Sequence, residues 1–196
     1  MSATAITSDV QHRRQPMSTA FPLGAVLTTA GSLGYIATNS LPPREASLHP
    51  VGLAGSAVAL LGCVILSLAL VQWRPRLPRW AVVTSAVGVW FAGAIAWSFV
   101  TIVPVAAAGT TNEQFDDLFF GNTWALWSML IKSTLCLVGF LGLAIAGWRS
   151  RSIPHAAAAV FALAALASIW PPFPPGLILA SLALVLVARS ESKTGG

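Results

Sequence analysis

One lysine, Lys132, lies inside a long apolar stretch and is the side chain in this sequence best placed to do chemistry. The stretch, residues 127–147, reads WSMLIKSTLCLVGFLGLAIAG and carries no other charge. Ser128 and Trp124 precede the lysine by four and eight residues, so a helix places all of them on one face. The ammonium group there can meet a ligand or ion in a cavity, contact an aromatic ring, or pair with a carboxylate.

Two further segments offer partners for this lysine. The preceding apolar stretch, taken as an antiparallel helix, has one tryptophan at a similar depth and a threonine nearer to the outer side. The loop between them, VAAAGTTNEQFDDLFFGNTW, carries the nearest acidic residues. We therefore predict a ligand-binding or structural polar cluster at the outer side, made of Lys132, Asp116, Asp117, Glu113, Trp97, Thr101, Trp124 and Ser128.

The role of Lys132 has several interpretations. A helix beginning at Thr123 puts the lysine about 13 Å below the outer end, where it costs a few kcal/mol unless it faces a cavity or a partner. It can snorkel outward if the membrane boundary lies at Trp127, or pin the loop through Asp116 or Asp117. We favour these structural roles. The alternatives are a vestibule for a ligand or ion and, last, direct transport.

The other residues that could do chemistry form no recognisable site. Cys63 and Cys136 lie deep in apolar stretches and read as small buried side chains. His12, His49 and His155 lie outside or at the ends of such stretches, which argues against a haem held within the membrane. Nucleotide-binding, hydrolase and zinc-protease motifs are absent from the sequence. We predict no metal site and no cofactor, and find no support for an enzyme.

Composition places the chain in a membrane. Hydrophobic residues make up 56% of the sequence and charged residues 9%, whereas a soluble domain carries about a quarter charged residues. The net charge of +5 does not indicate nucleic-acid binding, because the basic residues are dispersed among short loops. The lipid bilayer is therefore the expected partner.

Apolar segments along the chain predict an all-α integral membrane protein with six transmembrane helices. A hydrocarbon core of about 30 Å needs about 20 helical residues, and the second, third and fourth segments satisfy this well. The last two are short and separated by WPPFPPG; we favour two full spans over a re-entrant hairpin. The predicted helices are 21–38, 51–72, 80–103, 123–147, 155–170 and 175–188, in one domain (19–190) between flexible tails 1–18 and 191–196.

The basic residues predict that both termini are cytoplasmic, as in a bacterial-type inner-membrane protein. Lysine and arginine in short loops collect on the cytoplasmic side. With six spans and the N-terminus inside, the outer loops hold only Arg44. The inner segments hold Arg13, Arg14, Arg74, Arg76, Arg79, Arg149, Arg151, Arg189 and Lys193.

Small residues recur at intervals of four in three of the predicted helices. Such spacing lets helix backbones approach closely in a membrane. We favour packing within this bundle, with self-association or docking on a larger complex as the alternative. The residues are Gly55 and Ala59, then Gly88, Ala92 and Ala96, and finally Gly142 and Ala146.

For function, the sequence leads us to expect a small non-enzymatic membrane protein, an accessory or structural subunit or a self-associating bundle. The alternative is a small-solute or ion carrier or channel with an outer vestibule around Lys132. Substrate, partner and oligomeric state do not follow from the residues.

Overall fold

The structure is a computed structural model that describes residues 3–73, 77–169 and 175–194, with side chains described from Thr19 to Ser190 within these ranges. Every regular element in them is a helix, which confirms the all-α prediction for this part of the chain. The helices are α1 (Ala3–Ile36), α2 (Pro43–Leu48), α3 (Pro50–Gln72), α4 (Arg79–Ala108), α5 (Asn112–Phe120), α6 (Thr123–Ser150), α7 (His155–Ala167) and α8 (Pro175–Thr194).

Three of the described helices, α3, α4 and α6, are long and apolar enough to cross a membrane by length and composition. Helices α7 and α8 are apolar over shorter lengths, His155–Ala167 and Pro175–Ser190. This result supports a membrane protein, in agreement with the composition.

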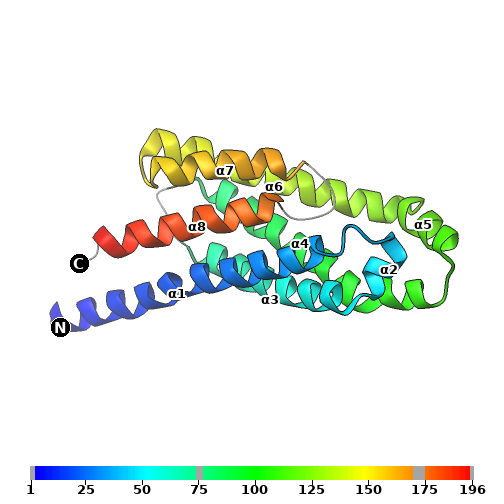
Figure 1. Ribbon diagram of the computed structural model, residues 1–196. Helices are drawn as coiled ribbons and strands as arrows, with labels where there is room; N and C mark the ends of the chain where they lie inside the picture. Colours follow the sequence, from blue (N-terminus) through cyan, green and yellow to red (C-terminus); the bar gives the residue numbers. More distant parts are fainter. Residues whose placement is uncertain (1–2, 74–76, 170–174, 195–196) are drawn as a thin grey trace.

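Six helices pack in a closed ring in the order α1, α3, α4, α6, α7 and α8, with α8 returning to α1 (Figure 1). Both ends of the chain lie at one end of this bundle (Figure 1). The short helices α2 and α5 lie at the opposite end, where they contact each other and α4. We call these the terminal end and the loop end of the bundle.

Local capping explains where the helices begin. The Nδ1 of His49 accepts the Val51 N–H at 3.3 Å at the start of α3, and Asn122 Oδ1 accepts the Trp124 N–H at 2.9 Å at the start of α6. Each satisfies a donor that the first helical turn leaves free. The predicted starts, residues 51 and 123, agree with these ends within one residue.

Several boundaries differ from the prediction. Helix α1 begins at Ala3, inside the stretch predicted as a flexible tail (1–18), since no proline or glycine interrupts residues 3–15. Likewise, α8 continues to Thr194 through most of the predicted tail 191–196. Helix α4 passes Pro104, beyond the predicted end at 103. Helix α7 ends at Ala167, short of the predicted residue 170, and Trp170 lies outside the described residues.

Helices α1 and α3 touch through their backbones. A Cβ built on Gly55 would lie 2.8 Å from the Gly31 carbonyl oxygen and 2.9 Å from the Tyr35 nitrogen. One built on Gly31 would collide with the backbone of Ala59 and Gly55. Glycine allows this approach because it has no side chain to hold the helices apart.

Helices α4 and α6 meet in the same way. A Cβ on Gly88 would lie 2.9 Å from the Cys136 nitrogen, and one on Gly139 would lie 2.6 Å from the Ser85 nitrogen. Gly142 abuts Trp80 and Ala81. Ala92 and Ala96 are buried, and Ala146 is half-buried against the core cluster that contains Ala92. Gly55, Gly88 and Gly142 of the small-residue stripes therefore lie at helix–helix contacts within this chain.

Candidate functional site

Lys132 points into the bundle. Its side chain is 6% exposed, and Cys136, Phe140 and Leu143, which follow it on the same face of α6, are buried with it. Burial of this degree means that the lysine does not extend along the lipid-facing surface. The lysine thus lies on the face of α6 that meets the other helices.

The depth of Lys132 follows from the contacts between α4 and α6. Gly88 lies against Cys136 and Gly139 against Ser85, so residue numbers on these antiparallel helices change in opposite directions. Continuing this register by one turn places Lys132 level with Ala92. Helix α6 begins at Thr123, nine residues or about 13 Å away along the axis.

The hairpin of α7 and α8 ends close to this depth. The rings of Phe140 and Phe161 stack with centroids 6.1 Å apart, which aligns α6 with α7. From there α7 continues about 9 Å to Ala167, whereas Lys132 lies about 12 Å from Phe140 along α6. Helix α8 begins beside the end of α7, since a Cβ on Gly176 would lie 2.9 Å from the Ser168 nitrogen.

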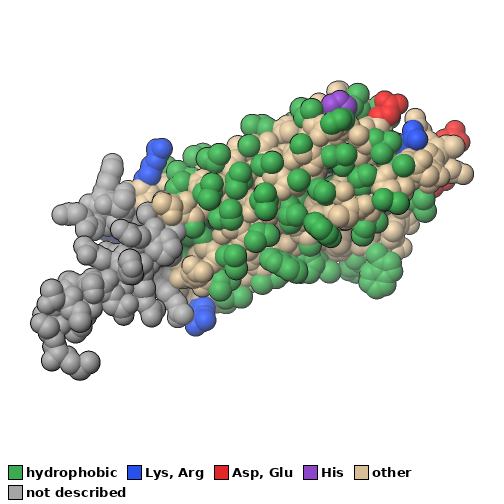
Figure 2. Space-filling model, turned by 90° about the horizontal axis from the view of Figure 1, so that it is seen from below, with side chains coloured by type: hydrophobic (Ala, Val, Ile, Leu, Met, Phe, Trp, Pro, Cys, Tyr) green, Lys and Arg blue, Asp and Glu red, His purple; other side chains and the backbone are tan. Residues whose placement is uncertain are grey.

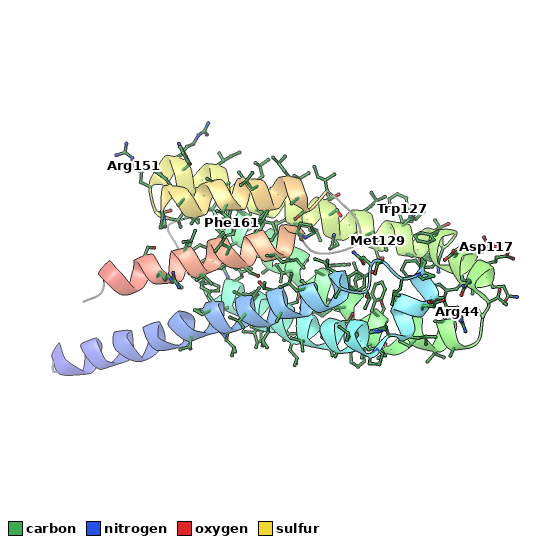
Figure 3. The ribbon with its side chains drawn as sticks, viewed as in Figure 1. Arg44, Asp117, Trp127, Met129, Arg151 and Phe161 are labelled. Atoms are coloured by element: carbon green, nitrogen blue, oxygen red, sulfur yellow. The ribbon has the colours of Figure 1, made fainter. Side chains whose placement is uncertain are left out.

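The ring of six helices is therefore complete only from the terminal end up to the depth of Lys132. Beyond it, α7 and α8 stop short of the loop end where α2 and α5 lie (Figure 1). The inward face of α6 changes accordingly: Ala125, Ser128 and Met129 are half-buried, whereas Lys132 is buried. Met129 and Trp127 lie on this outer part of α6 (Figure 3).

The aromatic and hydroxyl residues predicted to surround Lys132 lie elsewhere or have other partners. Trp124 is 82% exposed and Trp97 is 55% exposed, so neither walls a cavity with the lysine. The Thr101 hydroxyl donates to the Trp97 carbonyl at 2.8 Å, and Ser128 donates to the Ala125 carbonyl at 2.8 Å. Both hydroxyls are satisfied by their own helices.

The acidic residues of the predicted cluster do not pair with Lys132. Glu113 and Asp117 are exposed on α5, and Asp117 lies at the loop end together with Arg44 (Figure 3). One oxygen of Asp116, Oδ1, is enclosed without a hydrogen-bond partner. Across the described ranges, no ion pair joins the lysine to a carboxylate. Lys132 is consequently a buried cation without a counter-charge from the described part of the chain.

The two cysteines lie on either side of α4. A Cβ on Gly93 would lie 3.1 Å from the Cys63 Cβ, and Cys136 contacts Gly88. Both thiols are free and buried. Among the residues that the structure describes, His, Cys, Asp and Glu form no group of three that could hold a metal ion.

A cavity that the sequence did not predict lies at the loop end. It lies between the end of α1, α2, the start of α3, α4 and α5, and has a volume of about 180 Å³. Its walls include Phe115 and Phe119 of α5, which the Thr111–Gln114 capping box helps to hold. That motif, TNEQ, was a signal for a helix in a segment interpreted as a loop.

Comparison with protein-family models, with curated proteins and with solved structures finds no match to this chain.

Proposed function

We propose that this protein is a small, non-enzymatic membrane protein that binds a small anionic solute at Lys132, in the manner of a carrier. The observation that carries the proposal is the burial of Lys132 without a carboxylate partner in the described part of the chain. An unpaired cation within a membrane is costly, and an anion entering from the loop end supplies the missing charge.

A buried hydroxyl at nearly the same depth supports this assignment. Thr28 of α1 contacts Gly62, and the neighbouring Cys63 contacts Gly93, which is next to Ala92 at the level of Lys132. The Thr28 hydroxyl is enclosed beside the Cys63 thiol and has no oxygen or nitrogen partner among the described residues. Buried polar groups in proteins are normally satisfied by protein, water or ligand. The Thr28 hydroxyl therefore adds a hydrogen-bonding group to the layer of the bundle in which Lys132 lies.

We further infer a topology of six membrane-embedded helices with both termini cytoplasmic in a bacterial-type inner membrane. In this arrangement α1, α3, α4 and α6 cross, while α7 and α8 form a re-entrant hairpin from the cytoplasmic side. The 13 residues of α7 span about 20 Å, less than a hydrocarbon core of about 30 Å. This length favours the hairpin over the two full spans expected from the sequence.

Charge supports the orientation. Glu45, Glu113, Asp116 and Asp117 lie with Arg44 at the loop end, where Figure 2 shows the acidic side chains. Arg151 lies at the opposite end (Figure 3). The further basic residues described there are Arg79, Arg149 and Arg189. An excess of arginine at the terminal end is expected for a cytoplasmic surface.

Cysteine labelling tests this orientation. Thr111 is exposed at the loop end and Ser150 at the terminal end, and the native cysteines are buried. In intact cells, a membrane-impermeant maleimide is expected to label Thr111→Cys and to label Ser150→Cys only after permeabilisation. The reverse pattern, or labelling of both variants in intact cells, would show that the orientation is wrong.

Solute binding tests the function. We expect small anions, taken from a panel of chloride, acetate, lactate and phosphate, to raise the melting temperature of the detergent-purified protein. Substituting Lys132→Met should abolish the shift, because the only buried cation of the described chain is then gone. The measurement is thermal unfolding as a function of anion concentration.

The matched control for this experiment is Arg149→Met, which removes the same charge from the exposed last turn of α6. We expect it to keep the anion-induced shift. The proposal fails if no anion shifts the wild-type protein, or if Lys132→Met shifts as much as the wild type.

The second candidate function is an accessory or structural subunit of a larger membrane complex or homo-oligomer. It is favoured by the outer part of α6, where Leu126, Trp127 and Leu130 are exposed. The hairpin of α7 and α8 stops before it reaches this part of α6 and therefore does not cover it. A helix of another membrane protein could cover this surface. Stable co-purification in mild detergent, lost in Leu126→Ser/Leu130→Ser but retained in Leu182→Ser on α8, would support this role.

A further inference from the structure

The cavity at the loop end has walls of aromatic rings in mutual contact. Tyr35 meets Phe99 edge to face with centroids 5.4 Å apart, and Phe99 meets Phe119 in the same way at 5.7 Å. Phe119 in turn stacks on Phe115 at 5.7 Å. These rings come from α1, α4 and α5, so the cavity depends on the packing of elements far apart in the sequence.

Exposed and buried residues line the cavity together. Phe115 and Ser56 are each 2% exposed, whereas Phe120 and Asn39 lie on the surface. The cavity therefore extends from the surface of the loop end to buried side chains, which gives a small molecule a route inward.

One buried polar group is available on the wall. Ser56 of α3 lines the cavity, and its hydroxyl has no hydrogen-bond partner among the described residues. The other serine of the wall, Ser47, already donates to the Pro43 carbonyl at 2.7 Å. A ligand that brings one hydrogen-bonding group would satisfy Ser56, because a buried hydroxyl without a partner is unfavourable.

Charge and size narrow the class of ligand. None of the lining residues is charged, so neither an anion nor a cation finds a counter-charge on the wall. The volume of about 180 Å³ slightly exceeds the roughly 150 Å³ of an engineered protein cavity that admits benzene. Aromatic walls favour an aromatic guest through edge-to-face and offset contacts.

We propose that this cavity is a binding site for an uncharged compound with one aromatic ring and one hydroxyl group, of the phenol class. The ring lies among the phenylalanines and the hydroxyl meets Ser56. Such amphipathic aromatic compounds concentrate at the membrane interface, which is where the topology proposed above places the loop end of the bundle. The site shares no residue with the proposed anion site at Lys132.

The experiment compares ring compounds by thermal unfolding and by saturation-transfer NMR on the full-length protein in detergent. Phenol is the probe, with benzoate, benzyltrimethylammonium and cyclohexanol as the anionic, cationic and non-aromatic comparisons. We expect saturable binding of phenol and at least about tenfold weaker binding of the two charged compounds, since a buried charge costs more than about 1.4 kcal/mol. Cyclohexanol should bind about threefold to tenfold more weakly than phenol, because lost ring contacts cost about 0.5 to 1.5 kcal/mol.

Ala46→Leu tests the location. Ala46 lines the cavity from α2, a short surface helix, so a leucine there fills the space. We expect phenol binding to be lost. Ala108→Leu, at an exposed alanine near the end of α4 that does not line the cavity, is the matched control and should bind phenol as the wild type does.

Ser56→Ala tests the hydrogen bond without depending on how Ala46→Leu folds. Phenol should bind about fivefold more weakly, the equivalent of one neutral hydrogen bond, while toluene should bind equally to both proteins. The proposal is overturned if phenol does not saturate, if Ala46→Leu binds it unchanged, if a charged or non-aromatic probe binds as tightly, or if Ser56→Ala weakens phenol and toluene alike.

Discussion

Substitution of Gly55 by leucine is expected to lower the free energy of unfolding by more than about 3 kcal/mol, the upper end of ordinary overpacking in a core. A Cβ at this position would lie 2.8 Å from the Gly31 carbonyl oxygen, before any further side-chain atom is added. This oxygen and the Tyr35 nitrogen, which would lie 2.9 Å from the same Cβ, both belong to helix backbone. Helix backbone cannot rotate away as a side chain can. Helices α1 and α3 must therefore separate, and thermal unfolding in mild detergent measures the loss.

The control for this prediction is Gly109→Leu at the end of α4. A Cβ there would meet only carbonyl oxygens, with Val105 the nearest at 3.7 Å, so stability should change by less than about 0.5 kcal/mol, as at ordinary surface sites. Equal melting temperatures for Gly55→Leu and Gly109→Leu would contradict the close packing of α1 on α3.

The long helices were predictable because their signals are local. Helices α3 and α6 each follow a capping residue and carry an apolar run long enough to cross a membrane. Helix α1 was harder to delimit, because its polar N-terminal part and its apolar part form one helix from Ala3 to Ile36. Hydropathy marks the part of a helix in lipid and says little about where the helix begins outside it.

The site was less predictable because it depends on contacts between helices. Helical periodicity put Trp124, Ser128 and Lys132 on one face. Trp124 is nevertheless 82% exposed, because the hairpin of α7 and α8 does not extend far enough along α6 to cover it. The depth at which a neighbouring helix stops is a tertiary property. The aromatic cavity is of the same kind, since Tyr35 and Phe119 are brought together only by the fold.

Lys132→Met is expected to raise the free energy of unfolding by about 1 to 3 kcal/mol in the absence of solute. Insertion scales assign a lysine within a membrane a cost of about 2.5 to 3.5 kcal/mol, and detergent and water near the bundle reduce it. Methionine keeps the length of the side chain and removes the charge. Since the structure pairs this ammonium with no carboxylate in the described ranges, its removal breaks no ion pair.

The sign of this change separates the two roles of Lys132. A lysine that pins the loop through Asp116 or Asp117 would make Lys132→Met less stable, and Asp116→Asn/Asp117→Asn would lose a similar amount. If Lys132 instead binds an anion, Lys132→Met is more stable than the solute-free wild type. The free energy of unfolding of Asp116→Asn/Asp117→Asn then stays near that of the wild type. A stability gain together with a lost anion response is the pair of results that only the binding role produces, because a structural pin gives neither.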